Sequence, residues 1–131
     1  MLARSGWRAA MEAPPERMLA LIADASGQLM RRAARLLAIG ESVAAEDPAL
    51  SEFRERGHAA TRSDALAMAK ALKRAGVLRR GLSAQRAADV LYGLAASHDL
   101  YLRLVDQLGW SDQAYARMLE QALAGALIRQ V

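Results

Sequence analysis

Residues 82–109, LSAQRAADVLYGLAASHDLYLRLVDQLG, and residues 110–128, WSDQAYARMLEQALAGALI, are the part of the sequence that decides the fold. Ser83 and Ser111 stand where each offers a side-chain oxygen to the free amides of a helix N-terminus. Gly109 stands where a glycine ends a helix in a left-handed turn, with Val105 and Trp110 at the positions that touch across such an ending. The stretch therefore predicts two helices joined by a tight turn.

Both predicted helices carry more apolar surface than one interface covers. A helix that is apolar on more than one side is buried on more than one side. Because the chain is small, we expect one face of this hairpin to meet its own core and the other to meet a second copy, as four helices across a two-fold axis. The residues expected at the interface of this homodimer are Leu100, Leu104, Tyr115, Met118, Ala122 and Ala126.

The preceding residues predict further helices. Pro14 and Pro15 end a short helical piece, and a long helix follows over residues 16–45. Asp47 and Pro48 begin another, ended by Gly76 and open to division at Gly57 or residues 61–64. The apolar stripes at helical spacing are Met18, Leu21, Ile22, Ala25, Leu29, Ala33, Leu36, Leu37, Gly40 and Val43, then Leu50, Phe53, Gly57, Ala60, Met68, Ala71, Leu72 and Ala75. The predicted fold class is all-α, an antiparallel helical bundle of about five to six helices.

A series of short motifs follows residue 47 in a fixed order. The motifs are Asp47-Pro48, Arg74-Ala75-Gly76-Val77-Leu78, Gly81-Leu82-Ser83, Ala87-Ala88-Asp89-Val90-Leu91, Leu100-Tyr101-Leu102-Arg103-Leu104-Val105, Gly109-Trp110-Ser111 and Tyr115. In this order and spacing, residues 47–128 resemble the C-terminal domain of TetR-type (tetracycline-repressor family) transcriptional regulators of bacteria. The resemblance implies an all-helical domain that binds a small-molecule effector and dimerises through its last two helices.

Regulators of this family bind DNA through an N-terminal helix-turn-helix module, for which residues 1–12 are too short. Trp7, Ala9, Ala10 and Met11 are typical of the end of the helix that links that module to the sensor. We therefore expect residues 1–12 to be a remnant of the linker helix and residues 13–131 to be the effector-binding and dimerisation domain. By the resemblance, the effector shifts the population of helix arrangements and so controls DNA binding by a module absent from this chain.

Composition is that of one helical domain. The 131 residues include no cysteine, which fits a reducing cytoplasm and rules out disulfides and thiolate metal sites. No apolar run reaches the length of a membrane span. The net charge of +4 comes from basic residues spread along the chain, without interleaved aromatic side chains. We therefore expect neither a membrane nor direct nucleic-acid contact by this chain.

An effector pocket is expected to be mostly apolar with a few placed polar groups. His98 interrupts an apolar stripe, so it is either a core or interface histidine bonded to a carbonyl at a helix irregularity, or a polar group inside the effector cavity. The residues predicted to line the pocket are Met18, Ile22, Phe53, Thr61, Met68, Tyr92, His98 and Tyr101. Taken singly, each of these residues also fits an ordinary core position.

Enzyme chemistry has little support in the sequence. Glu55 and His58 have the E-x-x-H spacing of carboxylate di-iron bundles, but the second pair that such sites need is missing, so neither a metal nor a cofactor is expected. Ser97, His98 and Asp99 are adjacent on a helix, so their side chains diverge. The alternative to an effector sensor is a stand-alone helical homodimer that acts as an interaction module without a small-molecule ligand.

Overall fold

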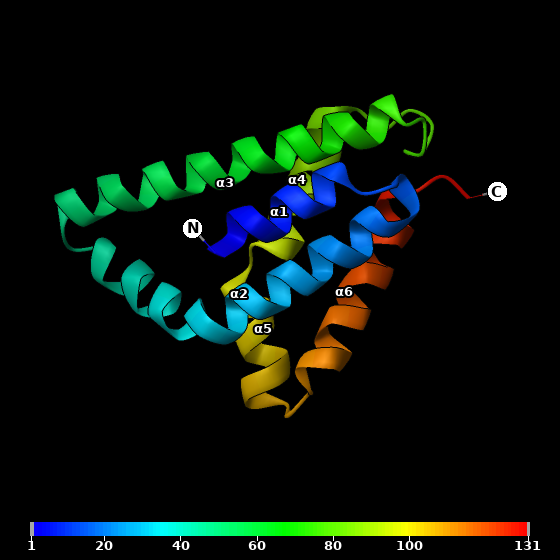
Figure 1. The fold of residues 1–131 in the computed structure, drawn as a ribbon. Coiled ribbons are helices and arrows are strands. Elements are labelled where there is room, and N and C mark those ends of the chain that lie inside the picture. The colour runs from blue at the N-terminus through cyan, green and yellow to red at the C-terminus, as the bar shows by residue number, and fades with distance from the viewer. Residues whose placement is uncertain (1, 131) are drawn as a thin grey trace.

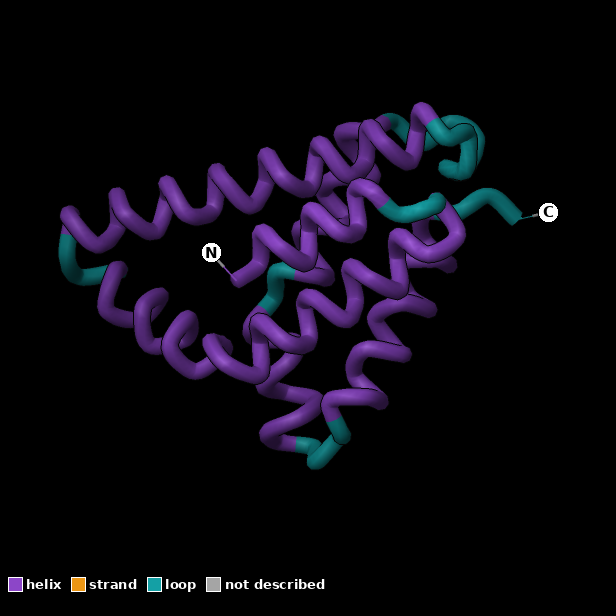
Figure 2. The backbone as a smooth tube through the Cα atoms, in the orientation of Figure 1, coloured by secondary structure: helices purple, strands orange, loops and turns teal. Residues whose placement is uncertain are grey.

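The computed structural model describes the backbone of residues 2–130 and the side chains of residues 8–130. Its elements are α1 (Leu2–Glu12), α2 (Pro15–Ala44), α3 (Pro48–Arg74), α4 (Ala84–Ala95), α5 (His98–Tyr101), the π-helical turn η1 (Leu102–Gln107) and α6 (Asp112–Leu127). The described residues hold six α-helices and no strand, only an isolated bridge between Leu78 and Ile128 (Figures 1 and 2). The prediction of an all-α bundle is confirmed.

The two long helices α2 and α3 join at one end of the molecule through the turn at residues 45–47, and α1 lies between them in the view of Figure 1. Helix α1 packs chiefly on α2, α4 packs on α3, and α6 runs beside α2. The core is formed where these helices meet, at the N-terminal half of α2 and the C-terminal half of α3. Its largest fully buried side chains are Ile22, Met30, Met68, Leu72, Leu91, Tyr115, Leu119, Leu123 and Leu127.

Local signals in the sequence placed the helix ends correctly. The Asp47 carboxylate accepts the amides of Ala49 (2.9 Å) and Leu50 (3.4 Å) and so caps α3. The Ser83 and Ser111 hydroxyls each accept an amide at 3.0 Å, as predicted for α4 and α6. Helix α3 is continuous from Pro48 to Arg74, so the division considered at Gly57 does not occur.

The predicted helix over residues 82–109 is interrupted, which corrects the sequence reading. Helix α4 ends at Ala95, and the Ser97 hydroxyl begins α5 by accepting the Leu100 amide at 3.1 Å. The buried Ser26 hydroxyl of α2 donates to the Ala95 carbonyl at 2.6 Å and so satisfies an acceptor that the break leaves free.

The end of this segment also differs from the predicted one. The wider π-helical turn shifts the closing hydrogen bond by one residue, so the Trp110 amide reaches the Leu104 carbonyl at 3.0 Å instead of that of Val105. Gly109 has the predicted positive φ, at 77°.

The outer halves of α2 and α3 extend past the core, which corrects the predicted stripes. Phe53 is 69% exposed and Leu36 is 70% exposed, and Leu37, Val43 and Leu50 are exposed as well. Between residues 35 and 64 only Ala44 is buried. Helical periodicity identifies the apolar side of a helix but not whether another element lies against that side. The distal parts of these two helices therefore present apolar side chains that no element of the described residues covers.

Helix α1 approaches α2 closely at a single glycine. A Cβ built on Gly6 would lie 2.6 Å from the Cβ of Ala25, a distance that only a backbone shift relieves. We expect Gly6→Ala to lower the free energy of unfolding by about 1–2 kcal/mol, measured by urea denaturation. Gly57→Ala is the matched control, because a Cβ there meets nothing within 4 Å and alanine favours the helix. Equal stabilisation by both substitutions would show that α1 does not pack on α2 in this way.

Candidate functional site

A hydrogen-bonded chain of three side chains joins α2, α3 and α4 near the joined end of the two long helices. His58 Nε2 of α3 lies 2.7 Å from Glu41 Oε1 of α2, and His58 Nδ1 lies 2.9 Å from the Tyr92 hydroxyl of α4. The side chains of His58 and Glu41 are 36% and 32% exposed. The Glu41–His58–Tyr92 cluster is therefore half-buried, held by two hydrogen bonds, and still open to solvent or a ligand.

The charge of His58 decides which way the hydrogen bonds of this cluster run. An ionised Glu41 only accepts, so His58 Nε2 carries a hydrogen and donates to it. In neutral His58 the Nδ1 atom then accepts from the Tyr92 hydroxyl. In protonated His58 both ring nitrogens donate, and the Tyr92 hydroxyl hydrogen becomes free for another acceptor. The cluster thus offers a ligand either an acceptor or a donor at Tyr92.

Two arginines stand at either end of the cluster. Arg54 of α3 contacts Glu41 (Nη1–Oε2, 3.3 Å) and Glu55 (3.4 Å). The Arg62 guanidinium carbon lies 5.7 Å from the centre of the Tyr92 ring, within the range of a cation–π interaction. The Arg54 Nε atom is buried and has no hydrogen-bond partner among the described residues. The two arginines face two carboxylates, Glu41 and Glu55, so it is the buried Arg54 Nε atom, without a partner in the described part of the chain, that favours a ligand group that accepts hydrogen bonds.

The pocket residues predicted from the sequence fall into separate places. Met18, Ile22, Met68 and Tyr101 are all buried in the common core, at 0–6% exposure. Phe53 is exposed, which corrects its assignment to a core stripe, whereas its place in a pocket wall stays a prediction. Of the eight predicted residues, Tyr92 belongs to the cluster, and Thr61 lies one turn along α3 from His58, donating to the Gly57 carbonyl at 3.0 Å.

His98 lies at the helix irregularity that its position in the stripe indicated. It is the first residue of α5, directly after the break that follows α4. Its side chain is 20% exposed, and its Nε2 atom lies 3.4 Å from the Asp99 carboxylate. The hydrogen-bond partner of Tyr92 is His58, and the partner of His98 is Asp99.

Glu41 was not predicted from the sequence, and His58 was considered only for its E-x-x-H spacing with Glu55. Glu41 lies 17 residues before His58, across the turn between α2 and α3, whereas Glu55 contacts Arg54. A signal for Glu41 was present, because it falls in one helical row with Ala34 and Ala44, both buried. A carboxylate in a buried row is costly unless it is paired, so a partner from a neighbouring helix is expected.

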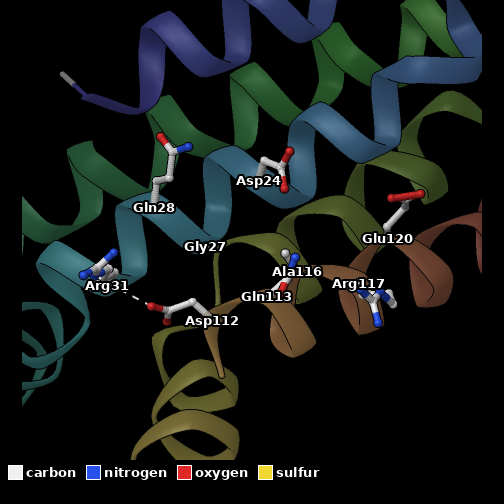
Figure 3. A pocket seen from close by; sticks show the side chains of 9 residues that line it. All are labelled: Asp24, Gly27, Gln28, Arg31, Asp112, Gln113, Ala116, Arg117 and Glu120. Carbon is white, nitrogen blue, oxygen red and sulfur yellow. Dashed lines mark ion pairs between the residues drawn. The ribbon is translucent and has the colours of Figure 1, made fainter. Parts of the chain in front are cut away.

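A cleft lined mostly by charged and amide side chains lies between α2 and α6 (Figure 3). This cleft has a volume of about 330 Å³, and its walls are Asp24, Gly27, Gln28, Arg31, Asp112, Gln113, Ala116, Arg117 and Glu120. Asp112 is engaged twice, by Arg31 at 3.7 Å and by the Tyr101 hydroxyl at 2.6 Å. Seven of the nine wall residues carry a charged or amide side chain, which suits a polar ligand better than a mostly apolar one, so we take the Glu41–His58–Tyr92 cluster as the better candidate for an effector site.

The residues predicted for the dimer interface differ in how far they are exposed to solvent. Tyr115 has no exposed area, and its ring packs edge-on against that of Tyr101 with 5.0 Å between the centroids. Tyr115 is therefore a core residue of the single chain, because burial leaves it nothing to offer a second copy. Ala126 is exposed, and Leu100, Leu104, Met118 and Ala122 are half-buried. An interface on the last two helices stays a prediction.

Comparisons with protein-family models, curated proteins and solved structures found no match to this chain. In the described part of the chain, no three His, Asp or Glu side chains come together as a metal site, and no helix of that part is long and apolar enough to cross a membrane.

Proposed function

We propose that this chain is the effector-sensing domain of a transcriptional regulator that resembles the TetR family, and that a small, mostly apolar effector binds at the Glu41–His58–Tyr92 cluster. The observation that carries the proposal is a half-buried hydrogen-bond chain across three helices, at the end of the bundle where few other side chains are buried. A hydrogen-bonded cluster with a purely structural role is expected inside a core, because burying polar groups costs free energy. Polar groups that stay partly exposed to solvent are typical of a binding site.

The expected effector has an apolar body and one group that hydrogen-bonds. Leu37 lies one turn before Glu41 on α2, and Leu50 is two turns before His58 on α3, so both are on the faces that carry the cluster. Their exposed fractions of 41% and 43% leave apolar surface for a ligand to cover. A hydroxyl or carboxylate of the effector would bond to Tyr92 or His58, next to the positive charges of the two arginines.

The proposed mechanism is a shift between helix arrangements. The cluster ties the outer half of α2 to α3 and α4. An effector that takes over the hydrogen bond between His58 and Tyr92 favours arrangements in which α4 stands further from α3. Helix α1 packs on α2, so a displacement of α2 would move α1. A DNA-binding module joined to α1 would then change its position, and with it its affinity for DNA.

The test is ligand binding measured by thermal denaturation, with a panel of small aromatic alcohols and carboxylic acids as probes. A binding probe raises the unfolding midpoint in a saturable way. Tyr92→Phe and Glu41→Gln are each expected to weaken that binding about tenfold, because each removes a hydrogen bond of the cluster. Glu55→Gln is the matched control, since Glu55 does not contact His58. Binding that is indifferent to Tyr92 and Glu41 would place the effector elsewhere.

The second candidate function is an interaction module that binds no small molecule. The exposed apolar side chains on α2 and α3 favour it, because such surface is typical of protein contacts. Under this function no probe of the panel changes the unfolding midpoint, and the Glu41–His58–Tyr92 cluster only stabilises the fold. Glu41→Gln then lowers the midpoint without any ligand-dependent effect.

A further inference from the structure

A row of exposed aliphatic side chains runs along the outer half of α2. Leu36, Ile39 and Val43 are 70%, 59% and 46% exposed and recur at i, i+3 and i+7. This spacing places them on one side of the helix, turned away from the buried Ala34 and Ala44. Single exposed aliphatic residues are ordinary, but a row at this spacing is the seam by which one helix packs against another.

A glycine lies at the middle of the same row. Gly40 is exposed, next to Ile39, and a Cβ built on it meets nothing within 4 Å. Glycine in a helix interior lowers helix stability by about 1 kcal/mol relative to alanine, and nothing in the chain itself uses the space that it leaves. A second helix crossing here could approach the α2 backbone closely.

Opposite charges lie at the two ends of the row. Arg32 stands one turn before Leu36 on the same side of α2 and is exposed. The exposed Glu46 and Asp47 follow Val43 in the turn to α3. The row is therefore basic at one end, apolar in the middle and acidic at the other end. When two copies of this row lie antiparallel, the basic end of each copy meets the acidic end of the other.

We propose that a second copy of this chain docks on this row, with the two α2 helices antiparallel about a two-fold axis between Ile39 and Gly40. In such an isologous pair, Leu36 of each copy faces Val43 of the other, and Ile39 faces Gly40. Arg32 of each copy then faces the acidic turn at Glu46 and Asp47 of the other, which gives two equivalent ion pairs at the rim. The charge complementarity fixes the antiparallel orientation, because parallel helices would bring like charges together.

The pairing is expected to be weak and reversible. Three aliphatic side chains per copy make a small apolar centre, below the roughly 800 Å² per partner of a standard interface. We therefore expect a dissociation constant of about micromolar order, visible as a change of sedimentation coefficient with concentration of the full chain. The proposal is independent of the effector site, since none of the paired residues belongs to the Glu41–His58–Tyr92 cluster.

The first experiment is sedimentation velocity of the Ile39→Asp variant over a wide concentration range. Ile39 lies at the centre of the seam, so we expect dimerisation to weaken on the order of a hundred-fold. Circular dichroism should remain unchanged, because Ile39 is exposed in the single chain. Ala126→Asp is the control, an exposed position on the face of α6 predicted from the sequence to dimerise. Loss of the dimer with Ala126→Asp but not with Ile39→Asp, or a monomer at every concentration, would overturn the proposal.

A charge exchange tests the orientation directly. Arg32→Glu places two carboxylates opposite each other at both ends of the row and is expected to weaken the dimer about tenfold. Adding Glu46→Arg in the same chain restores the opposite charges, so the double variant should recover most of the affinity. Recovery requires that the two positions face each other between copies. A double variant that is weaker than either single variant would exclude the antiparallel pairing.

Discussion

Replacing Met68 with alanine is expected to lower the free energy of unfolding by about 2–5 kcal/mol. Met68 has no exposed area and belongs to the same core cluster as Ile22 and Leu91, which come from two other helices. Truncation removes the apolar contacts of the thioether and leaves a cavity that three packed helices do not close. Urea denaturation followed by circular dichroism gives the change in stability.

Phe53→Ala is the matched control for this prediction, because the sequence placed Met68 and Phe53 on one apolar stripe. Phe53 is 69% exposed, so its removal should change the free energy of unfolding by less than about 0.5 kcal/mol. If Met68 lined an effector cavity instead of the core, its truncation would change ligand affinity with little loss of stability. Similar destabilisation by both substitutions would contradict the placement of the core.

Features that depend on a few neighbouring residues were predictable from the sequence. The serine and aspartate caps act within a turn of their own position, and Gly76 closes α3 as expected, with the Val77 amide on the Leu72 carbonyl at 3.3 Å. Pro15 begins α2 because its ring suits the first turn of a helix. The all-α class follows from these signals together with the helical periodicity.

Features that depend on distant partners were not predictable in the same way. The break after Ala95 is supported by Ser26, which is 69 residues away in the sequence. The partner of His58 is set by the turn between α2 and α3, whereas a spacing rule within one helix relates His58 only to Glu55. Of the candidate site, the sequence therefore named Tyr92 and Thr61 but not the residues that hold Tyr92 in place.

The apolar stripe on the outer half of α2 is another feature whose partner could not be predicted from the sequence. Periodicity correctly placed Leu36 and Val43 on an apolar side of the helix, and the single chain leaves that side exposed. An apolar stripe on a helix indicates that another element covers that side, and the element can belong to the same chain or to another chain. The disagreement between predicted and observed burial on α2 is therefore the reason for which we propose that a second copy covers this side.

Tyr101→Phe is expected to lower the free energy of unfolding by about 2 kcal/mol at pH 7, because it removes a hydrogen bond to a carboxylate. The Tyr101 hydroxyl donates to Asp112 Oδ1 at 2.6 Å and joins α5 to the start of α6. Burial, followed by this bond to Asp112, raises the pKa of Tyr101 from 10.0 to about 12. The raised pKa means that the neutral phenol is favoured by folding. The stabilisation is therefore complete below pH 10 and is lost as the pH rises through about 12.

Tyr115→Phe is the matched control for Tyr101→Phe, because it removes the same hydroxyl group from a buried tyrosine that has no hydrogen-bond partner in the described part of the chain. The two variants together separate the effect of the hydrogen bond to Asp112 from the effect of burial. The Tyr115 hydroxyl is buried and has no hydrogen-bond partner among the described residues. Burial raises the pKa of Tyr115, and the nearby Ser26 hydroxyl partly offsets that rise. Both variants should lessen the loss of stability above pH 10, since folding favours the neutral form of each phenol. At pH 7 only Tyr101→Phe is expected to destabilise, whereas Tyr115→Phe removes an unsatisfied group and should be neutral or slightly stabilising. Equal losses at pH 7 would show that the hydrogen bond from Tyr101 to Asp112 contributes no more to stability than the unpartnered hydroxyl of Tyr115 does.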